Sequence, residues 1–188
     1  MTIAIKPTAS GATIEQNGST ILTVDGSGNI AIANNLSVTG TSPLPTGPAF
    51  RAVTSGGQSV STVTLTKIIF DTEQFDTNSN YDSATNYRFT PTVAGYYQVN
   101  LSLGWGSTQV AVSDVFIYKN GASYAQARLW QADDYNIHHT STLVYLNGST
   151  DYIEGYVRHD AGFVGGGSRT ISGDVARTFF DAHLVRAA

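Results

Sequence analysis

Alternating apolar and polar side chains run along most of this chain, and the clearest run lies between Gly95 and Trp105. Its regularly spaced apolar members are Tyr97, Val99, Leu101, Leu103 and Trp105. This period of two predicts a strand of an antiparallel sheet with one face buried in a core. The same period predicts a last strand that directs Phe180, Ala182 and Leu184 inward.

Turn sequences separate the predicted strands at regular intervals. Asn120-Gly121 follows an apolar run that ends at Tyr118, and this dipeptide is a strong short-range signal for a hairpin. Asn147-Gly148 predicts a second turn of this kind, between a strand that ends at Leu146 and one over 151–158. About eight short strands joined in this way predict an antiparallel sandwich or jelly roll. We therefore expect an all-β protein.

The distribution of aromatic side chains divides the chain in two. All eight Phe, two Trp and ten Tyr residues lie from Phe50 onward. Three of the five prolines cluster immediately before this point, which predicts a proline-rich linker over 41–48. The sequence thus predicts a head over 49–188 and a separate segment over 1–40.

The segment over 1–40 has a regular apolar pattern but no aromatic side chains. Its period-2 apolar pairs are Leu22 with Val24, Ile30 with Ile32, and Leu36 with Val38. A segment this short cannot bury enough apolar surface to offset its ordering entropy. It is therefore either disordered or shares a core with other copies. The alternation favours the second interpretation, a short β-stem in which several chains intertwine.

Composition and charge exclude several classes of protein. Only 13% of the residues are charged and the net charge is −4, which argues against nucleic-acid binding through a basic surface. Cysteine is absent, so the chain has no disulfide and no thiolate metal site. No apolar run approaches the roughly 18 residues of a membrane span, so we expect no membrane insertion. No leader peptide is visible, so we expect synthesis in a cytoplasm.

Catalytic motifs are missing from the sequence. It has no Gly-x-Ser-x-Gly elbow, no His-Glu-x-x-His helix and no phosphate loop, so we expect no enzyme and no catalytic residues. We expect no cofactor, with calcium at Asp133 and Asp134 as a candidate ion. On a strand, His138 and His139 point to opposite faces and cannot chelate one metal within a chain. One of them could bind a transition metal only together with its copies in other chains of an oligomer, and a surface or interface histidine without metal is the favoured interpretation.

The order of the strand motifs resembles the C1q-like head, a jelly roll of the tumour-necrosis-factor type. The residues that carry the resemblance are Pro48–Ala52, Tyr81-Asp82, Phe89–Pro91, Gly95–Val99, Val115–Gly121 and Phe180–Leu184. Val99 stands where the family has an aromatic residue and Ala182 where it has glycine, and Leu146–Asp151 is two residues longer than the family pattern. The resemblance implies a homotrimer.

The strand over 110–119 is a candidate for the trimer interface. Val110, Val112 and Phe116 alternate with further apolar residues, so the strand is apolar on both faces. In a two-layer sandwich such a strand needs a partner beyond its own core, and a neighbouring subunit provides one. We therefore expect Val110, Val112, Phe116 and Tyr118 at the interface.

The stem resembles a second class of protein. Leu22–Ile30 and Asn35–Gly40 are similar to segments near the heads of bacteriophage tail fibres. With a trimeric head, this resemblance predicts a virion structural protein, a fibre or fibre-tip subunit that recognises the host surface. Its first residues would bind other virion proteins. The alternatives are a capsid decoration or collar fibre, and a cellular C1q-like recognition protein.

One predicted turn has the composition of a binding site. It contains Trp130, Asp133, Asp134, Tyr135 and Asn136. Aromatic platforms with nearby polar side chains suit a host glycan or protein receptor, although Trp and Tyr also pack at subunit interfaces. Three such heads on one stem would bind with avidity.

Overall fold

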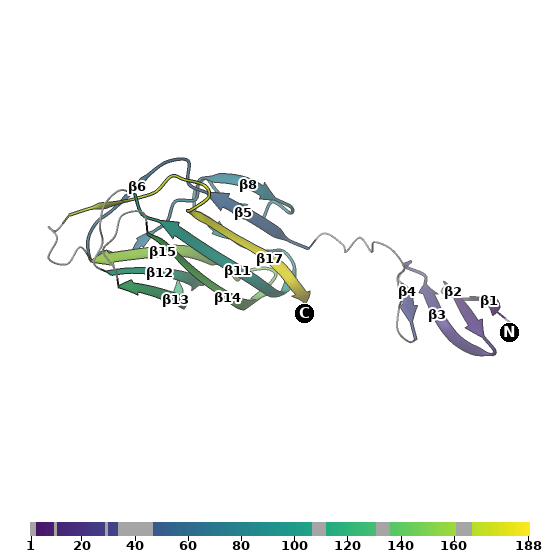
Figure 1. Cartoon of the computed structure of the whole chain (residues 1–188). Helices are drawn as coiled ribbons and strands as arrows, with labels where there is room; N and C mark the ends of the chain where they lie inside the picture. The colour runs from purple at the N-terminus through teal and green to yellow at the C-terminus, as the bar shows by residue number, and fades with distance from the viewer. Residues whose placement is uncertain are drawn as a thin grey trace. The chain divides into compact units, whose positions relative to one another are not determined.

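The computed structural model describes residues 3–9, 11–28, 30–33, 47–106, 112–130, 136–160 and 167–188. Every regular element in these ranges is a β-strand, as Figure 1 shows. In the part of the chain that is described, no helix is long and apolar enough to cross a membrane. Contacts within the chain define two compact units, Met1–Leu44 and Pro45–Ala188.

The N-terminal unit contains one antiparallel sheet of four strands in sequence order. The strands are β1 (Ile3–Thr8), β2 (Gly11–Gln16), β3 (Ser19–Asp25) and β4 (Ile30–Ile32). A turn follows β3, with the Gly28 amide donating to the Asp25 carbonyl oxygen at 3.0 Å. Leu36 and Val38 lie outside the described residues.

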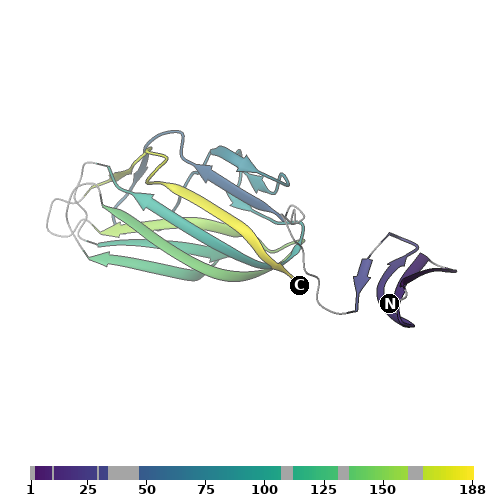
Figure 2. The same cartoon turned by 45° about the vertical axis from the view of Figure 1, so that its right-hand side comes forward.

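The larger unit, the head, is built from two sheets that pack as layers (Figures 1 and 2). The first sheet has the order β14 (Ile137–Asn147), β11 (Ala94–Gly104), β17 (Phe179–Ala187), β5 (Ala49–Val53) and β8 (Thr72–Asp76). The second has the order β13 (Ala122–Trp130), β12 (Val112–Lys119), β15 (Ile153–Asp160), β10 (Arg88–Phe89) and β9 (Tyr81–Asp82), with β7 (Thr66–Lys67) paired to β15. A further pair joins β16 (Arg169–Ile171) to β6 (Gln58–Val60).

The core between the sheets is aromatic. The ring of Phe50 lies 4.6 Å from Tyr81, 4.5 Å from Phe89 and 5.2 Å from Phe180, measured between ring centroids. All the residues predicted on the inner face of 95–105 are buried, so the predicted strand is confirmed. It corresponds to β11, and Trp105 comes directly after the last residue of β11. Phe180 and Ala182 are also buried, as predicted.

The two predicted hairpin turns have different outcomes. Asn120 and Gly121 have φ angles of 52° and 78° and join β12 to β13 as an antiparallel pair, so the first hairpin is confirmed. The prediction of a second hairpin at Asn147-Gly148 is wrong, because β14 and β15 belong to different sheets. The Asn147 side-chain oxygen accepts hydrogen bonds from the amides of Ser149, Thr150 and Asp151, at 3.0, 2.9 and 2.9 Å. These bonds hold a wider turn that crosses between the layers.

Candidate functional site

The predicted receptor site is described only at its two ends. Trp130 ends β13, and 71% of its surface is exposed. Asn136 precedes β14, and its carbonyl oxygen accepts a hydrogen bond from the Trp105 amide at 3.0 Å. Asp133, Asp134 and Tyr135 lie outside the described residues, so the glycan site and the calcium site both remain predictions. In the described ranges, no three His, Cys, Asp or Glu side chains are grouped as a metal would require.

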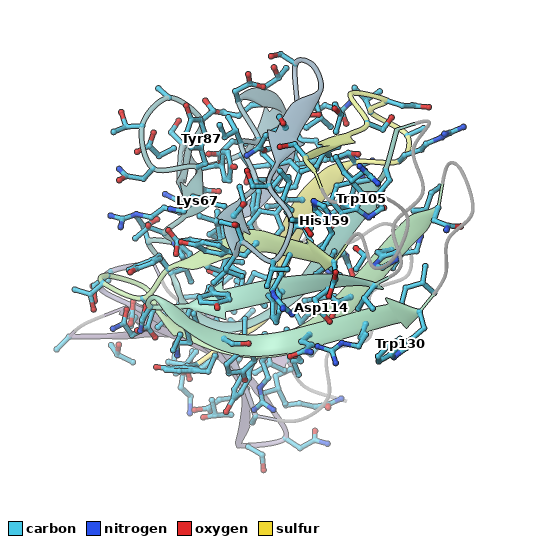
Figure 3. The ribbon with its side chains drawn as sticks, turned by 90° about the vertical axis from the view of Figure 1, so that its left-hand side faces the viewer. Lys67, Tyr87, Trp105, Asp114, Trp130 and His159 are labelled. Carbon is cyan, nitrogen blue, oxygen red and sulfur yellow. The ribbon has the colours of Figure 1, made fainter. Side chains whose placement is uncertain are left out.

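A buried carboxylate organises the surface beside Trp130. The side chain of Asp114 on β12 is almost fully buried beneath two arginines of the neighbouring strands. Its oxygens accept hydrogen bonds from Arg128 Nε at 2.6 Å, Arg128 Nη2 at 3.0 Å and Arg158 Nη1 at 3.4 Å. The bidentate contact fixes the plane of the Arg128 guanidinium, and its hydrogen bonds raise the pKa of Arg128. Figure 3 shows Asp114 within the sheet and Trp130 near its margin.

Arg128 and Trp130 together form an exposed cation and indole pair. The Arg128 Cζ atom lies 5.7 Å from the Trp130 ring centroid, within the range of a cation–π contact. The two bonds to Asp114 fix the guanidinium, and 42% of the Arg128 side chain stays exposed. A fixed donor edge beside an aromatic plane is suited to binding a polar ligand that also has an apolar face. This arrangement could not be predicted from the sequence, because it depends on which residues oppose Asp114 across the sheet.

Further along the same sheet, aromatic residues cover the outward side of β12. The Tyr118 ring lies 4.4 Å from Tyr156 and 6.1 Å from Phe116, between centroids. Val112, Phe116 and Tyr118, predicted at the trimer interface, point outward and are half-buried. Val110 lies outside the described residues. Side chains of the same sheet therefore cover part of this apolar surface within one chain.

A more exposed apolar surface lies on the other sheet. Tyr96 of β11 opposes Tyr145 of β14, and Leu143 opposes Gln98 one row further along. The Tyr96 and Tyr145 rings contact edge to face at 5.5 Å, yet each remains exposed, and 51% of Leu143 is exposed. We call Tyr96, Leu143 and Tyr145 the β11–β14 patch. This patch was not predicted from the sequence, because it forms only when β11 and β14 are paired.

A polar cluster adjoins the β11–β14 patch. Arg51 Nη1 and Asn100 Nδ2 both bond the Asp181 carboxylate, at 3.0 and 2.7 Å, and Arg51 Cζ lies 3.8 Å from the centre of the Phe179 ring. These residues line a hollow of about 420 Å³. Because the charges are already paired within the chain, a partner surface could cover them without leaving either charge unpaired.

The adjacent histidines lie on opposite faces of β14, as predicted. His139 is exposed, whereas only 3% of His138 is exposed and neither of its ring nitrogens has a hydrogen-bond partner among the described residues. Burial lowers the pKa of His138 to about 4, opposed in part by the charge of Asp114. His138 is therefore neutral at pH 7. Its burial excludes a part in surface recognition.

Trp105 and His159 form a second buried group, side by side inside the head (Figure 3). Their rings lie 5.3 Å apart, Trp105 Nε1 donates to Ser113 Oγ at 2.9 Å, and a His159 ring nitrogen lies 2.9 Å from the Val60 carbonyl oxygen. Trp105 is fully buried, which confirms its assignment to the core. Of the two tryptophans, Trp130 is thus the one available to a partner.

Comparisons with known proteins identify the fold of the head. No protein-family model and no curated protein matches the sequence. Murine APRIL is 10% identical, with a TM-score of 0.57 over 74% of this chain and 99% of that one. Eiger TNF from S. frugiperda is 15% identical, with a TM-score of 0.54 over 76% of this chain and 94% of that one. The globular domain of zebrafish complement 1qA is 17% identical over 75% of this chain and 99% of that one, with a TM-score of 0.46.

These similarities define a class for the head. It is an antiparallel jelly roll of the tumour-necrosis-factor type, as the resemblance to the C1q-like head implied. Identities of 10% and 15% extend this conclusion to the fold alone.

Proposed function

We propose that the protein is a homotrimeric recognition protein, whose heads associate through the β11–β14 patch and bind a partner through the surface around Trp130 and Arg128. The observation that carries this proposal is the exposure of Tyr96, Leu143 and Tyr145 together on one sheet face. Clustered exposed apolar side chains mark protein contact sites. The number of three rests on the resemblance to the C1q-like head. Such a protein needs no catalytic centre.

Binding by a trimer depends on several weak contacts acting together. Three heads present three copies of the Trp130 surface, and the second and third contacts form at a high effective concentration. Avidity can exceed the affinity of one contact by about 10²- to 10⁴-fold. A glycan or protein displayed in many copies on a cell surface suits this mode of binding.

A bacteriophage tail-fibre subunit is a more specific form of the proposal. It is supported by the resemblance of Leu22–Ile30 to fibre segments and by an N-terminal sheet with an exposed apolar face. In this form the N-terminal unit binds other virion proteins, the head binds the host surface, and the protein is located in the virion. A capsid decoration or collar fibre has the same architecture. Adsorption of the purified protein to bacterial cells would favour the virion forms over a cellular C1q-like protein.

The interface is tested by comparing charged substitutions on the two sheets. Light scattering behind a sizing column should give three times the chain mass for the unaltered protein. We expect the double variant Leu143→Asp with Tyr145→Asp to be monomeric, because buried unpaired carboxylates oppose association. Phe116→Asp is the matched variant on the other sheet and should keep the trimer mass. Circular dichroism checks that each variant is folded.

Two results would contradict this assignment. Dissociation by Phe116→Asp but not by the double variant would place the interface on 110–119, as the sequence pattern predicted. A monomeric unaltered protein at all concentrations would remove the trimer and the avidity that depends on it.

The recognition surface is tested with Trp130→Ala. The indole is exposed and adjacent to a fixed guanidinium, so we expect its loss to weaken each contact about 30-fold, as at an interface hot spot of about 2 kcal/mol. Binding is measured on a glycan array and on intact bacterial cells. Gln126→Ala is the control, since Gln126 is an exposed residue on the same strand. Equal loss in both variants, or none in either, would remove Trp130 from the site.

A further inference from the structure

The sheet of the N-terminal unit has one continuous apolar face. Cross-strand partners place Ile5, Ile14, Leu22 and Ile32 in one row over all four strands. The adjoining row contains Pro7, Ala12, Val24 and Ile30. Directly opposed residues point to the same side of a sheet, so both rows lie on one face. We call these eight residues and Ile3 the stem face.

The other face of this sheet is polar. Its central row contains Lys6, Thr13, Thr23 and Ala31. Residues 1–49 hold three charged side chains, Lys6, Glu15 and Asp25, and the register places all three on the polar face. Lys6 Nζ lies 2.6 Å from Glu15 Oε2, which pairs two of them. The stem face therefore carries no charge.

Nothing in the described part of the N-terminal unit covers the stem face. No residue of this part is fully buried, and 72% of Ile5 and 62% of Ile30 are exposed. A unit of about 40 residues with one sheet and no second layer buries too little apolar surface to be stable alone in water. Within one chain, the described part of this sheet therefore leaves its apolar face accessible to solvent.

We infer that the stem face is the contact surface between copies of this chain, whose N-terminal sheets pack with their stem faces together. An uncharged, apolar partner is required, and another copy of the same face meets this requirement. Packing in this way leaves Lys6, Glu15 and Asp25 on the outside of the assembly. The inference deepens the proposed function, because trimeric heads would hold their N-terminal sheets at a high effective concentration.

The geometry favours another copy over a lipid surface. Protein segments that lie on membranes usually carry Lys or Arg beside their apolar face. The one cation of this unit, Lys6, lies on the opposite face and is paired with Glu15. A row of isoleucine, leucine and valine with no cation beside it is typical of a sheet-to-sheet core.

Hydrogen exchange on the full chain tests the inference. We expect slow exchange at the amides of β2 and β3 in the unaltered protein. Ile14→Asp places a charge at the centre of the stem face and should speed the exchange of these amides by at least about 100-fold. Thr13→Asp is the matched control, since it adds the same charge to the same strand on the polar face. It should keep the slow exchange. Both variants should keep the mass of the oligomer, which the heads determine.

The outcomes separate this inference from the proposed function. Unchanged exchange in Ile14→Asp would overturn the stem contact and leave the head interface untouched. Slow exchange that appears only with phosphatidylcholine and phosphatidylglycerol vesicles would also overturn it, in favour of a lipid surface. A third outcome combines two results: Ile14→Asp loses the slow exchange, and the double variant Leu143→Asp with Tyr145→Asp keeps the oligomer mass. This outcome would support the stem contact and contradict the head interface.

Discussion

Phe50→Ala is expected to lower the free energy of unfolding of the head by about 3–5 kcal/mol, the cost typical of deleting a buried phenylalanine ring. Phe50 is fully buried and contacts the rings of Tyr81, Phe89 and Phe180. These partners come from β9, β10 and β17, so the lost ring leaves a cavity where both sheets meet. Urea unfolding followed by tryptophan fluorescence, at one fixed protein concentration, measures the change.

Phe75→Ala is the matched control for this substitution. Phe75 lies on β8, opposite Arg51 of the neighbouring strand, and about half of it is exposed. The same deletion at this position should cost less than about 1 kcal/mol. Equal losses in the two variants would mean that the aromatic cluster around Phe50 is not the centre of the core.

Acid is expected to destabilise the head between pH 6.5 and pH 4 through His138. Its pKa is about 4 in the folded chain and 6.5 when exposed, so in this window the unfolded state binds the extra proton. The free energy of unfolding is therefore unaffected by His138 above pH 6.5, where His138 is neutral in both states. It decreases as the pH falls from 6.5 to 4, because the unfolded state gains a proton that the folded state does not bind. The difference corresponds to about 3 kcal/mol. Urea midpoints across this range measure it.

His138→Leu isolates the effect. Leucine has a similar volume and no titrating group, so the loss of stability between pH 6.5 and pH 4 should shrink by about 3 kcal/mol in this variant. His159, whose pKa is also lowered by burial, contributes equally to both proteins and cancels in the comparison. A parallel decline in both proteins would contradict the assignment to His138.

Local patterns were enough to predict much of the fold. The alternation over 95–105 determined which side of β11 is buried, because a period of two has only one apolar face to place in a core. Asn120-Gly121 predicted its hairpin since both residues adopt positive φ angles there. Asn147-Gly148 has the same letters, but Asn147 uses its side chain to bond three amides and the turn widens. A dipeptide therefore could not predict which sheet the next strand joins.

The candidate site was less accessible to sequence reasoning. Trp130 could be recognised from its type and its place in a polar segment. Asp114 could not be linked to Arg128 and Arg158, because the three residues meet only through the register of β12 with two other strands. The β11–β14 patch likewise depends on the pairing of Tyr96 with Tyr145. Which residues become neighbours across the sheets depends on the long-range register of the strands. The local patterns along one sequence do not determine that register.

No residue is fully buried in the described part of the N-terminal unit, and this determines the order in which the two units fold. The N-terminus leaves the ribosome first, yet its sheet has no core until other chains arrive, whereas the head contains its own core and can fold within one chain. Folding would then proceed against the direction of synthesis, with the stem completed last. During this interval the edge strands β1 and β4 are open to wrong pairing. Rapid association of the heads would shorten the time during which these edges are open. The head would then act as a chaperone for the N-terminal unit.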